Sequence, residues 1–312
     1  MAEILTAPPR HDRQGPAISP TLTVVIASVN GWHVLEPTLR ALDALPERPA
    51  MEILVVEAVG GETRERLRGH SPKVVVVESS RQPIPRLRYQ GVVRARGDFV
   101  AILEDHTEVG PAWAETIVSR LNGPWGAVGG AVENGRDGLI NWAVFFCEYA
   151  AYMGPVREGE SSDLPGNNIA YRRPLLLRHA GVLDEGKWES WVNDELRADG
   201  VPLASANAMM VRHIKPFRLG YFLRQRFHFA RSYAGMRRGD QSRLKRLVYG
   251  AGSLVLPALL TARVTKTVLG KRRHIGLFCA VSPLVVLFLT VGAMGEMVGY
   301  LVGPGRSLDR VE

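Results

Sequence analysis

The stretch Gly97–His106, which reads GDFVAILEDH, decides the fold of this chain. The run from Phe99 to Leu103 is apolar and short, as expected of a buried strand, and Gly97 marks its start. Two carboxylates and an imidazole follow where the strand must end. In an open α/β sheet, ligands bind beyond the carboxyl ends of the strands. Carboxylate oxygens with one imidazole nitrogen suit Mg²⁺ or Mn²⁺, so a metal site is predicted; a solvated turn after a core strand is the alternative.

Compact apolar strands alternate with helices through the first hundred residues. Near-continuous valine, isoleucine and leucine strands are typical of a parallel sheet covered on both faces. The predicted strands comprise residues 22–27, 53–56, 74–77 and 99–103. The predicted helices comprise residues 37–45, 63–69 and 86–96. The first part of the chain is therefore expected to be an α/β unit that binds its ligand at the strand ends.

Beyond the acidic stretch the pattern is less regular. A helix is predicted at 113–121, and a glycine-rich strand at 126–132 that a ligand or another backbone segment can approach closely. The aromatic-rich run 139–153 predicts an amphipathic helix, either beneath an acceptor site or simply part of the core. The remaining predicted elements are the segment GNNIAYRR at 166–173 and helices at 174–180 and 193–200.

After His213 the chain is densely cationic and aromatic. The basic residues are Lys215, Arg218, Arg224, Arg226, Arg231, Arg237 and Arg238. Basic residues interleaved with aromatic ones could bind single-stranded nucleic acid, a diphosphate or a membrane surface. We rank nucleic acid last and expect no nucleic-acid partner, because the sequence that follows is membrane-like.

Two apolar stretches follow, Leu247–Ala262 and Ile275–Gly295. The second is uncharged and long enough to span a bilayer, whereas the first is short and contains a proline. The basic residues of 263–273 are predicted to form a loop between them. Because short basic loops stay inside, we expect the first stretch to lie in the interface or re-enter, and 275–302 to span once or bend at Pro283. Two buried core helices are the soluble alternative.

The composition of the 312 residues limits the possible partners and compartments. A net charge of +8 favours an anionic partner. Cys147 and Cys279 are too few for a disulfide framework and lack metal-ligand spacing, so a reducing compartment is expected. Residues 1–20 are proline-rich and polar, which predicts a disordered tail, and they lack the apolar centre of a signal peptide. The folded part that precedes the apolar stretches is therefore expected in the cytoplasm.

In this order the elements resemble the family 2 glycosyltransferases of the GT-A fold, over residues 22–234. The likeness lies in a first strand ending at Ser28, an acid after the second strand, the acidic triplet, the segment G-x-N-x-A-x-R-R, a late acid and closing arginines. The resemblance implies a Rossmann-like, mostly parallel catalytic domain followed by membrane-associated helices. The implied divisions are a catalytic domain at 21–245, with a nucleotide-sugar half at 21–130 and an acceptor half at 131–245, then helices at 246–303 and a tail at 304–312.

The resemblance also implies site residues. Donor-binding residues would be Ser28, Glu57, Arg88, Glu104, Asp105, Arg226 and Arg231. Acceptor-binding residues would be Asn168, Arg172, Arg173, Trp188 and Trp191. A Mg²⁺ or Mn²⁺ cofactor would be held by Glu104, Asp105 and His106, although the family has aspartates at the first and third of these positions. The catalytic base would be Glu189, which an ungapped count back from Gly200 selects, with Asp194 as its rival.

The activity that the resemblance implies is inverting transfer from a nucleotide-diphospho-sugar to a glycan or to a polyprenyl- or lipid-linked acceptor. Such transfer breaks the bond to a diphosphate through an oxocarbenium-like transition state. One carboxylate suffices, because its only task is to remove the proton of the acceptor hydroxyl. The expected location is the inner membrane, with membrane lipids as partners and the catalytic domain on the cytoplasmic side.

Two other functions stay open at this point. A sugar-nucleotide nucleotidyltransferase has a similar sheet, but it should carry a G-x-x-x-R-x-x-x-K-like loop after the first strand, which residues 28–39 lack. A non-catalytic scaffold that binds sugar nucleotides or lipids is the second alternative. The unusual Glu-Asp-His triplet is the feature that favours the scaffold.

Overall fold

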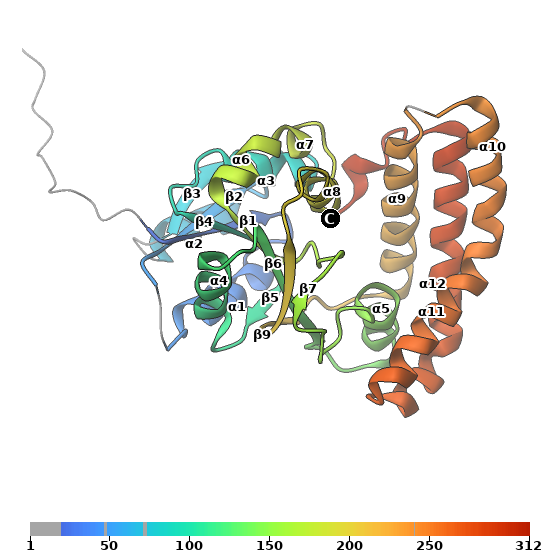
Figure 1. Cartoon of the computed structure of the whole chain (residues 1–312), viewed down its shortest axis with the longest axis horizontal. Helices are drawn as coiled ribbons and strands as arrows, with labels where there is room; N and C mark the ends of the chain where they lie inside the picture. The colour runs from blue at the N-terminus through green and yellow to red at the C-terminus, as the bar shows by residue number, and fades with distance from the viewer. Residues whose placement is uncertain (1–19, 47–48, 71–73, 240) are drawn as a thin grey trace, which may run out of the picture.

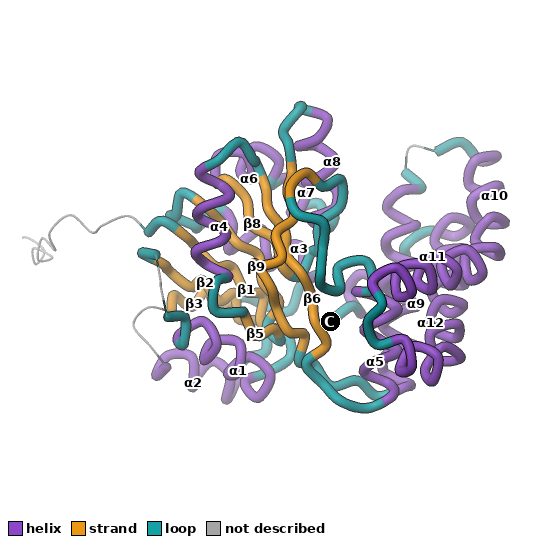
Figure 2. Tube along the Cα trace, turned by 60° about the horizontal axis from the view of Figure 1, so that its bottom comes forward, coloured by secondary structure: helices purple, strands orange, loops and turns teal. Residues whose placement is uncertain are grey.

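A computed structural model describes residues 20–46, 49–70, 74–239 and 241–312 (Figure 1). The predicted tail, residues 1–20, lies outside the described residues except for Pro20. The described chain forms a sheet with helices on both faces, and a group of long helices stands beside it (Figure 2). The α/β class with C-terminal apolar helices is thereby confirmed.

The first four strands form the parallel part of the sheet, in the spatial order β3-β2-β1-β4. They are β1 (Leu22–Ser28), β2 (Met51–Glu57), β3 (Val74–Glu78) and β4 (Phe99–Glu104). The connecting helices are α1 (Trp32–Asp43), α2 (Gly61–His70) and α3 (Ile84–Val92). Every residue of β1 is buried, as expected of a strand covered on both sides. All four strands end at the same edge, where the sequence predicts a site.

The start of β4 is packed tightly against β1. A Cβ atom on Gly97 would lie 2.6 Å from the backbone nitrogen of Thr23, so only glycine fits there. The Gly97 amide donates to the Thr23 hydroxyl at 2.8 Å. This close approach fixes where β4 begins, and therefore where its acidic end emerges.

The second half extends the same sheet in mixed directions, giving the order β3-β2-β1-β4-β8-β6-β9-β5, with β7 paired to β9. Its strands are β5 (Thr107–Val109), β6 (Ala127–Asn134), β7 (Gly159–Glu160), β8 (Asn168–Arg172) and β9 (Leu203–His213). β8 runs antiparallel to β4 and to β6, whereas β6 and β9 are parallel. Its helices are α4 (Trp113–Asn122), α5 (Leu139–Tyr149), α6 (Arg173–His179), α7 (Gly181–Asp184) and α8 (Glu189–Ala198).

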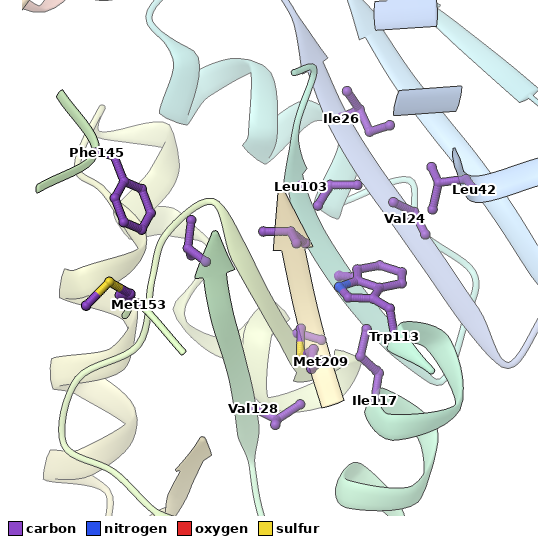
Figure 3. Close-up of a cluster of buried hydrophobic side chains, with 14 of the residues drawn as sticks. Val24, Ile26, Leu42, Leu103, Trp113, Ile117, Val128, Phe145, Met153 and Met209 are labelled. Carbon is purple, nitrogen blue, oxygen red and sulfur yellow. The ribbon is translucent and has the colours of Figure 1, made fainter. Parts of the chain in front are cut away.

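Hydrophobic side chains fill both faces of the sheet. On one face α1 and α4 cover the strands, and Trp113 of α4 lies among Val24, Leu103 and Val128 (Figure 3). The Trp113 indole nitrogen donates to the Asn168 side chain at 2.8 Å, which satisfies the one polar atom it buries. On the other face α3, α6, α7 and α8 cover the sheet. A hydrophobic cluster on each face of the sheet thus fixes the positions of the strand ends.

The remaining helices form a separate group beside the sheet (Figures 1 and 2). They are α9 (Leu219–Arg237), α10 (Arg243–Gly252), the short 3-10 turn η1 (Ser253–Val255), α11 (Leu256–Lys271) and α12 (Ile275–Val302). The aromatic rings of Phe222 on α9 and Phe288 on α12 meet at 4.6 Å between centroids. Phe146 on α5 meets Phe278 on α12 at 5.3 Å. One side of α12 is therefore covered by α9 and α5, which belong to the domain that carries the sheet, from β1 to α9.

Within the part of the chain that the structure describes, two helical segments are long and apolar enough to cross a membrane, Arg243–Lys271 and Ile275–Val302. The expectation that the first apolar stretch is too short to cross is wrong, because α10, η1 and α11 form one helical segment of 29 residues. Its proline lies in the first turn of α11, where a missing amide costs little. The predicted basic loop is also wrong: residues 263–271 are helical, and the turn comprises only residues 272–274.

The chain reverses after α12 and packs back against α9. Gly303 and Gly305 have positive φ angles of 106° and 52°, which side-chain-bearing residues adopt rarely. The 3-10 turn η2 (Leu308–Arg310) follows, and Gln225 of α9 donates to the Arg310 carbonyl at 3.0 Å. The residues expected as a short tail are therefore attached to the body of the protein.

Candidate functional site

A cavity of about 450 Å³ opens at the carboxyl ends of β1 and β4. Its other walls come from α5, α8, α9 and the segments that precede and follow them. The polar residues around it include Asn30, Arg88, Glu104, Asp105, His106, Glu148, Asn167, Glu189, His213, Lys215, Gln225 and Arg226. The edge of the sheet that the sequence selects is thus where the cavity lies.

Three side chains at the cavity are arranged as a possible metal site: Glu104, His106 and His213, whose ligand atoms all lie within 4.8 Å of one another. The Nε2 atom of His106 is 3.1 Å from Glu104 Oε2, and the two imidazole rings meet edge to face at 4.7 Å. Glu104 ends β4, and the pairing of β5 with β9 places Thr107 opposite His213. One carboxylate and two imidazoles are a suitable donor set for a divalent ion such as Mn²⁺.

The electrostatics of this cluster favour the metal-binding forms of Glu104 and His213. Burial lowers the pKa of His106, but Glu104 and Asp105 outweigh burial and raise it, so a metal ion would have to displace a proton from His106. Burial raises the pKa of Glu104, but His106 and Arg88 outweigh burial and lower the pKa to about 2. Burial and the neighbouring His106 lower the pKa of His213 to about 3. At neutral pH the glutamate is therefore a carboxylate and His213 a neutral imidazole, which are the states that bind metal ions.

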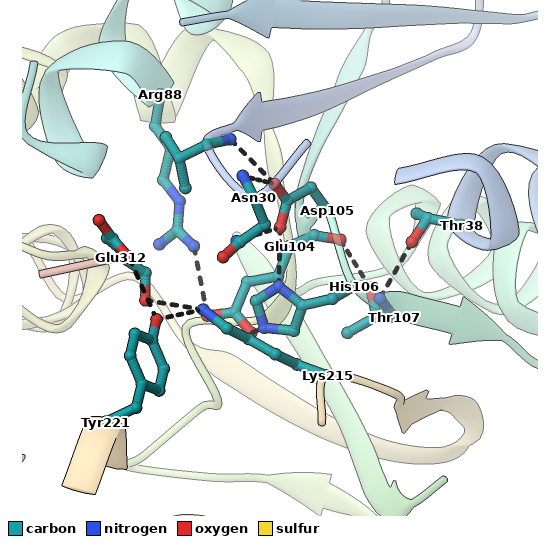
Figure 4. Close-up of polar contacts among 11 residues, drawn as sticks. Asn30, Thr38, Arg88, Glu104, Asp105, His106, Thr107, Lys215, Tyr221 and Glu312 are labelled. Atoms are coloured by element: carbon teal, nitrogen blue, oxygen red, sulfur yellow. Dashed lines mark hydrogen bonds and ion pairs between the residues drawn. The ribbon is translucent and has the colours of Figure 1, made fainter. Parts of the chain in front are cut away.

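Asp105 contacts both the turn after β1 and the His106 ring of this cluster. Its Oδ2 accepts the backbone amides of Val29 and Asn30 at 2.9 and 3.0 Å, and its Oδ1 accepts the Asn30 side chain at 2.8 Å (Figure 4). Oδ1 is also 2.7 Å from His106 Nδ1. Asp105 thus holds the turn after β1 and orients the His106 ring, as partners behind metal-binding histidines commonly do. Direct metal binding by Asp105 stays a prediction.

Arg88 and Glu189 form a buried ion pair beside the cluster. Arg88 Nη1 lies 2.6 Å from Glu189 Oε2, and Arg88 Nη2 lies 3.7 Å from Glu104 Oε1. Both side chains of the pair are only 2% exposed. The other oxygen, Glu189 Oε1, is buried and has no hydrogen-bond partner among the described residues. One oxygen of Glu189 is fixed and the other is available to a ligand in the cavity.

The structure brings only some of the predicted site residues to the cavity. Those that line it are Arg88, Glu104, Asp105, His106, Trp188, Glu189 and Arg226. Those that do not are Ser28, Glu57, Asn168, Arg172, Arg173, Trp191, Asp194 and Arg231. Their ligand-binding roles stay predictions.

Most of the residues outside the lining have other contacts. Glu57 accepts the amides of Val59 and Gly60 at 2.6 and 2.7 Å and pairs with Arg64. Asn168 binds Trp113 and two backbone carbonyls. The contacts of the others are Arg172 with the carbonyls of Leu121 and Gly123, Asp194 with Arg197, Arg231 with the Gly303 carbonyl, and Trp191 with the Tyr233 ring.

Several cavity residues were not foreseen from the sequence. His213 completes the metal-like cluster, although it stands 107 positions after His106. Asn167, next to the predicted Asn168, lines the cavity. Its side-chain oxygen and nitrogen are both buried and have no hydrogen-bond partner among the residues that the structure describes. Lys215 is 7% exposed and donates to the Tyr221 hydroxyl at 2.8 Å. The signals in the sequence were the start of the cationic segment at His213 and the repeated asparagine.

A Rossmann-like parallel half, a mixed second half and an acid–histidine cluster at the strand ends define a glycosyltransferase of the GT-A type. The chain belongs to glycosyl transferase family 2, whose model matches residues 23–178. The resemblance seen in the sequence is thereby confirmed.

Solved structures of similar fold support this class. A mannosyltransferase from Pyrobaculum calidifontis, PcManGT, in complex with GDP-Man and Mn²⁺, has a TM-score of 0.60 at 18% identity, over 89% of this chain and 87% of that chain. GalNAc-T7 with UDP, GalNAc and Mn²⁺ has a TM-score of 0.51 at 16% identity, over 64% of this chain and 44% of that chain. At these identities the likeness concerns the fold.

A curated human relative is similar over a shorter region. Polypeptide N-acetylgalactosaminyltransferase 15 of Homo sapiens is 27% identical over 134 residues, which is 40% of this chain. The matched region spans only 20% of the human enzyme's length. The similarity therefore covers part of each chain, and donor and acceptor remain to be argued from the cavity.

Proposed function

We propose that this glycosyltransferase moves a sugar, with inversion, from a nucleotide-diphospho-sugar to a glycan or lipid-linked acceptor. The observation that carries the proposal is that the Glu104–His106–His213 cluster lines the same cavity as Glu189, whose Oε1 atom has no hydrogen-bond partner among the described residues. The cluster is suited to hold a divalent ion that binds a diphosphate. The free oxygen of Glu189 is suited to accept the proton of an acceptor hydroxyl. The family membership and the Mn²⁺-containing neighbours point the same way.

Charge neutralisation is assigned to the sheet side of the cavity. Glu104, His106 and His213 would hold Mg²⁺ or Mn²⁺, which when bound supplies positive charge for the departing diphosphate. Arg226 is half-buried in the wall from α9, 3.7 Å from Glu148, and its Nε atom has no partner among the described residues. It is available to donate to a phosphate oxygen.

Glu189 is the proposed base, with Arg88 as its positioning residue. The 2.6 Å contact to Arg88 fixes one carboxylate oxygen and leaves the second free to receive the proton of the acceptor hydroxyl. The acceptor oxygen then bonds to the anomeric carbon as the bond from that carbon to the diphosphate breaks. Because the base acts on the face opposite the leaving group, the configuration inverts. The complete cluster favours this enzyme over the non-catalytic scaffold.

The acceptor is proposed to be lipid-linked, with the catalytic part on the cytoplasmic side of the inner membrane. Support comes from α9, which lines the cavity with Phe229 and Tyr233 and packs on the candidate membrane helix α12. The helical segment Arg243–Lys271, which precedes α12, has exposed apolar side chains such as Leu254 and Leu259. A lipid-linked acceptor would therefore be held at the same membrane surface as this segment.

The first test measures nucleotide release. Full-length protein incubated with UDP- or GDP-sugars should release UDP or GDP in the presence of Mn²⁺, and a chelator should stop the release. His213→Asn should weaken Mn²⁺ binding at least tenfold, since even losing a partner behind a metal ligand costs about 10–100-fold in affinity. His179→Asn is the control, because His179 pairs with Asp199 outside the cavity. Equal Mn²⁺ affinity in both variants would contradict the metal assignment.

The second test concerns the base. Glu189→Gln keeps an amide oxygen for Arg88 but cannot take a proton, so donor affinity should persist while turnover falls by roughly 10²–10⁴-fold. Asp194→Asn is the matched control: its side chain is exposed and paired with Arg197 at 2.5 Å. A large loss with Asp194→Asn and normal turnover with Glu189→Gln would assign the base to Asp194 instead.

A further inference from the structure

An acidic residue of the chain's own last segment sits in the donor cavity. Val311 and Glu312 line the cavity together with the metal-like cluster. The Lys215 ammonium donates to the Glu312 carbonyl at 3.4 Å, and the Tyr221 hydroxyl donates to the Glu312 carboxylate at 3.3 Å (Figure 4). The other carboxylate oxygen pairs with Arg81. Glu312 therefore contacts two cations and a hydroxyl, the set of groups that an anionic ligand would use.

Lys215 is the shared element between this contact and the proposed reaction. Burial lowers its pKa, and Asp105 and Glu104 oppose that effect, so it lies in the field of the carboxylates on the sheet side. An ammonium so placed would be attracted to a diphosphate bound at the cluster. The Lys215 ammonium cannot direct all its hydrogen bonds to a diphosphate while it also contacts Glu312.

We propose that the segment Ser307–Glu312 is a displaceable gate, in which Glu312 occupies the anionic position of the donor cavity. A metal-bound nucleoside diphosphate must displace Glu312 from Lys215 and Tyr221 before the cavity can take the whole donor. The identification of the competing ligand as a nucleoside diphosphate rests on the proposed function. The contact between Glu312 and Lys215 does not depend on the proposed function.

The attachment of the gate is suited to reversible release. His228 and Ser307 contact each other at 3.1 Å, Gln225 donates to the Arg310 carbonyl at 3.0 Å, and the Glu312 amide donates to Gln225 at 2.9 Å. Hydrogen bonds of this kind contribute modestly, because water replaces them on release. The helical part of the gate is a single 3-10 turn with no buried residue. Segments with few buried apolar contacts open at low free energy.

Calorimetric titration with Mn·UDP and Mn·GDP tests the gate on the full-length protein. Glu312→Gln removes the side-chain charge that Tyr221 and Arg81 contact, although the main-chain contact with Lys215 stays. The variant should bind the nucleotide about tenfold more tightly, the factor expected when a site is open one-tenth of the time. Asp309→Asn is the matched control, since it removes the same charge from the same segment at an exposed position that does not line the cavity. Equal or weaker binding by Glu312→Gln than by Asp309→Asn overturns the proposal.

Hydrogen exchange of the amides of residues 308–312 gives a second readout. Exchange should accelerate when Mn·UDP binds, because the segment leaves Gln225; slower exchange would mean that the segment closes over the ligand, which overturns the gate. Lys215→Met should accelerate exchange without any nucleotide, and unchanged exchange would show that Lys215 does not hold the segment. If no variant binds either nucleotide, the proposed function fails, and the Lys215→Met result still decides the gate.

Discussion

Glu52 lies on β2 at the end of the sheet opposite the cavity, and it holds the start of β4 in place. Its carboxylate accepts the Thr23 hydroxyl at 2.7 Å, the Arg96 amide at 2.8 Å and the Arg96 guanidinium at 2.6 and 2.8 Å. Burial raises the pKa of Glu52, but these hydrogen bonds outweigh it and lower the pKa below its ordinary value. The charged form is thus stabilised by folding.

Glu52→Gln is expected to lower the free energy of unfolding by about 1–3 kcal/mol at pH 7, since charged hydrogen bonds are lost from a buried site. A carboxyl whose pKa is lowered on folding stabilises above its unfolded pKa, and the effect disappears as the pH falls through the folded pKa. The difference between wild type and variant in urea unfolding should therefore shrink below about pH 4.5, the ordinary value. Glu62→Gln, on the surface of α2, is the control; a pH-independent difference for Glu52→Gln would contradict the prediction.

Site residues could be predicted from the sequence when they lie close in the chain to a recognisable strand, and not when they come from a distant part of the chain. Glu104 and His106 could be located because they directly follow a strand that the sequence identifies. His213 could not, because only the pairing of β5 with β9 brings it to His106. Asp105 has the right chemistry for a metal ligand, but its carboxylate is used by the turn after β1. The group that a carboxylate contacts depends on the tertiary structure, and the local sequence does not specify it.

The contact between α9 and α12 depends on glycines. Cβ atoms at Gly295 and Gly299 would lie 2.4 and 2.5 Å from the carbonyl oxygens of Phe227 and Arg231, and one at Gly292 would meet the Arg226 side chain at 2.8 Å. Small residues four apart let two helix backbones approach closely. Because α9 carries Gln225, Phe229 and Tyr233 of the cavity wall, this helix contact also positions the site.

Gly295→Ala should therefore destabilise the protein by about 1–3 kcal/mol, the usual cost of overpacking, and weaken donor binding through α9. Gly276→Ala on the same helix is the matched control. No atom lies within 4 Å of its would-be Cβ, so alanine should stabilise that position by up to about 1 kcal/mol. Thermal unfolding in detergent would measure both. Similar melting temperatures for the two variants would show that the close contact does not contribute.

Predictability at the level of elements followed the strength of the hydrophobic pattern. The four parallel strands are apolar and β-branched, and all four were predicted. β9 was missed because its sequence, LASANAMMVRH, contains small and polar residues and few β-branched ones. The end of α11 was expected as a loop because of its charges, yet lysine and arginine are good helix formers. The α1 helix begins at Trp32, five residues before the predicted start at Pro37.

The whole molecule restricts how the apolar helices can meet a bilayer. The domain that carries the sheet accompanies α12 along its length, from Phe278 against Phe146 to Gly299 against Arg231. An upright crossing would carry α9 and its arginines into the hydrocarbon region, where each charge costs about 2.5–3.5 kcal/mol on insertion scales. The turn between α11 and α12 is also tied to β6 through Arg273 and Glu133 at 2.6 Å. We infer that the turn stays on the same side as the sheet.

A cysteine at Thr267, in a Cys147→Ser, Cys279→Ser background, tests this topology. It should resist membrane-impermeant thiol reagents in intact cells and react after lysis if α11 stays with the domain that carries the sheet and that domain lies, as proposed, on the cytoplasmic side. A cysteine at Val59, exposed on the domain that carries the sheet, is the matched control and should show the same pattern. Labelling at Thr267 but not at Val59 in intact cells would mean that the segment crosses the membrane.

The α9 helix has one side in the cavity and the other on α12, and this has a mechanical consequence. A helix is stiff over 19 residues, so α9 cannot follow a tilt of α12 without moving Gln225 and Phe229. For a helix that lies at the membrane surface, lipid composition and curvature influence how it binds. The surrounding lipid then becomes something that the cavity senses, and a rate constant measured in one detergent belongs to that detergent.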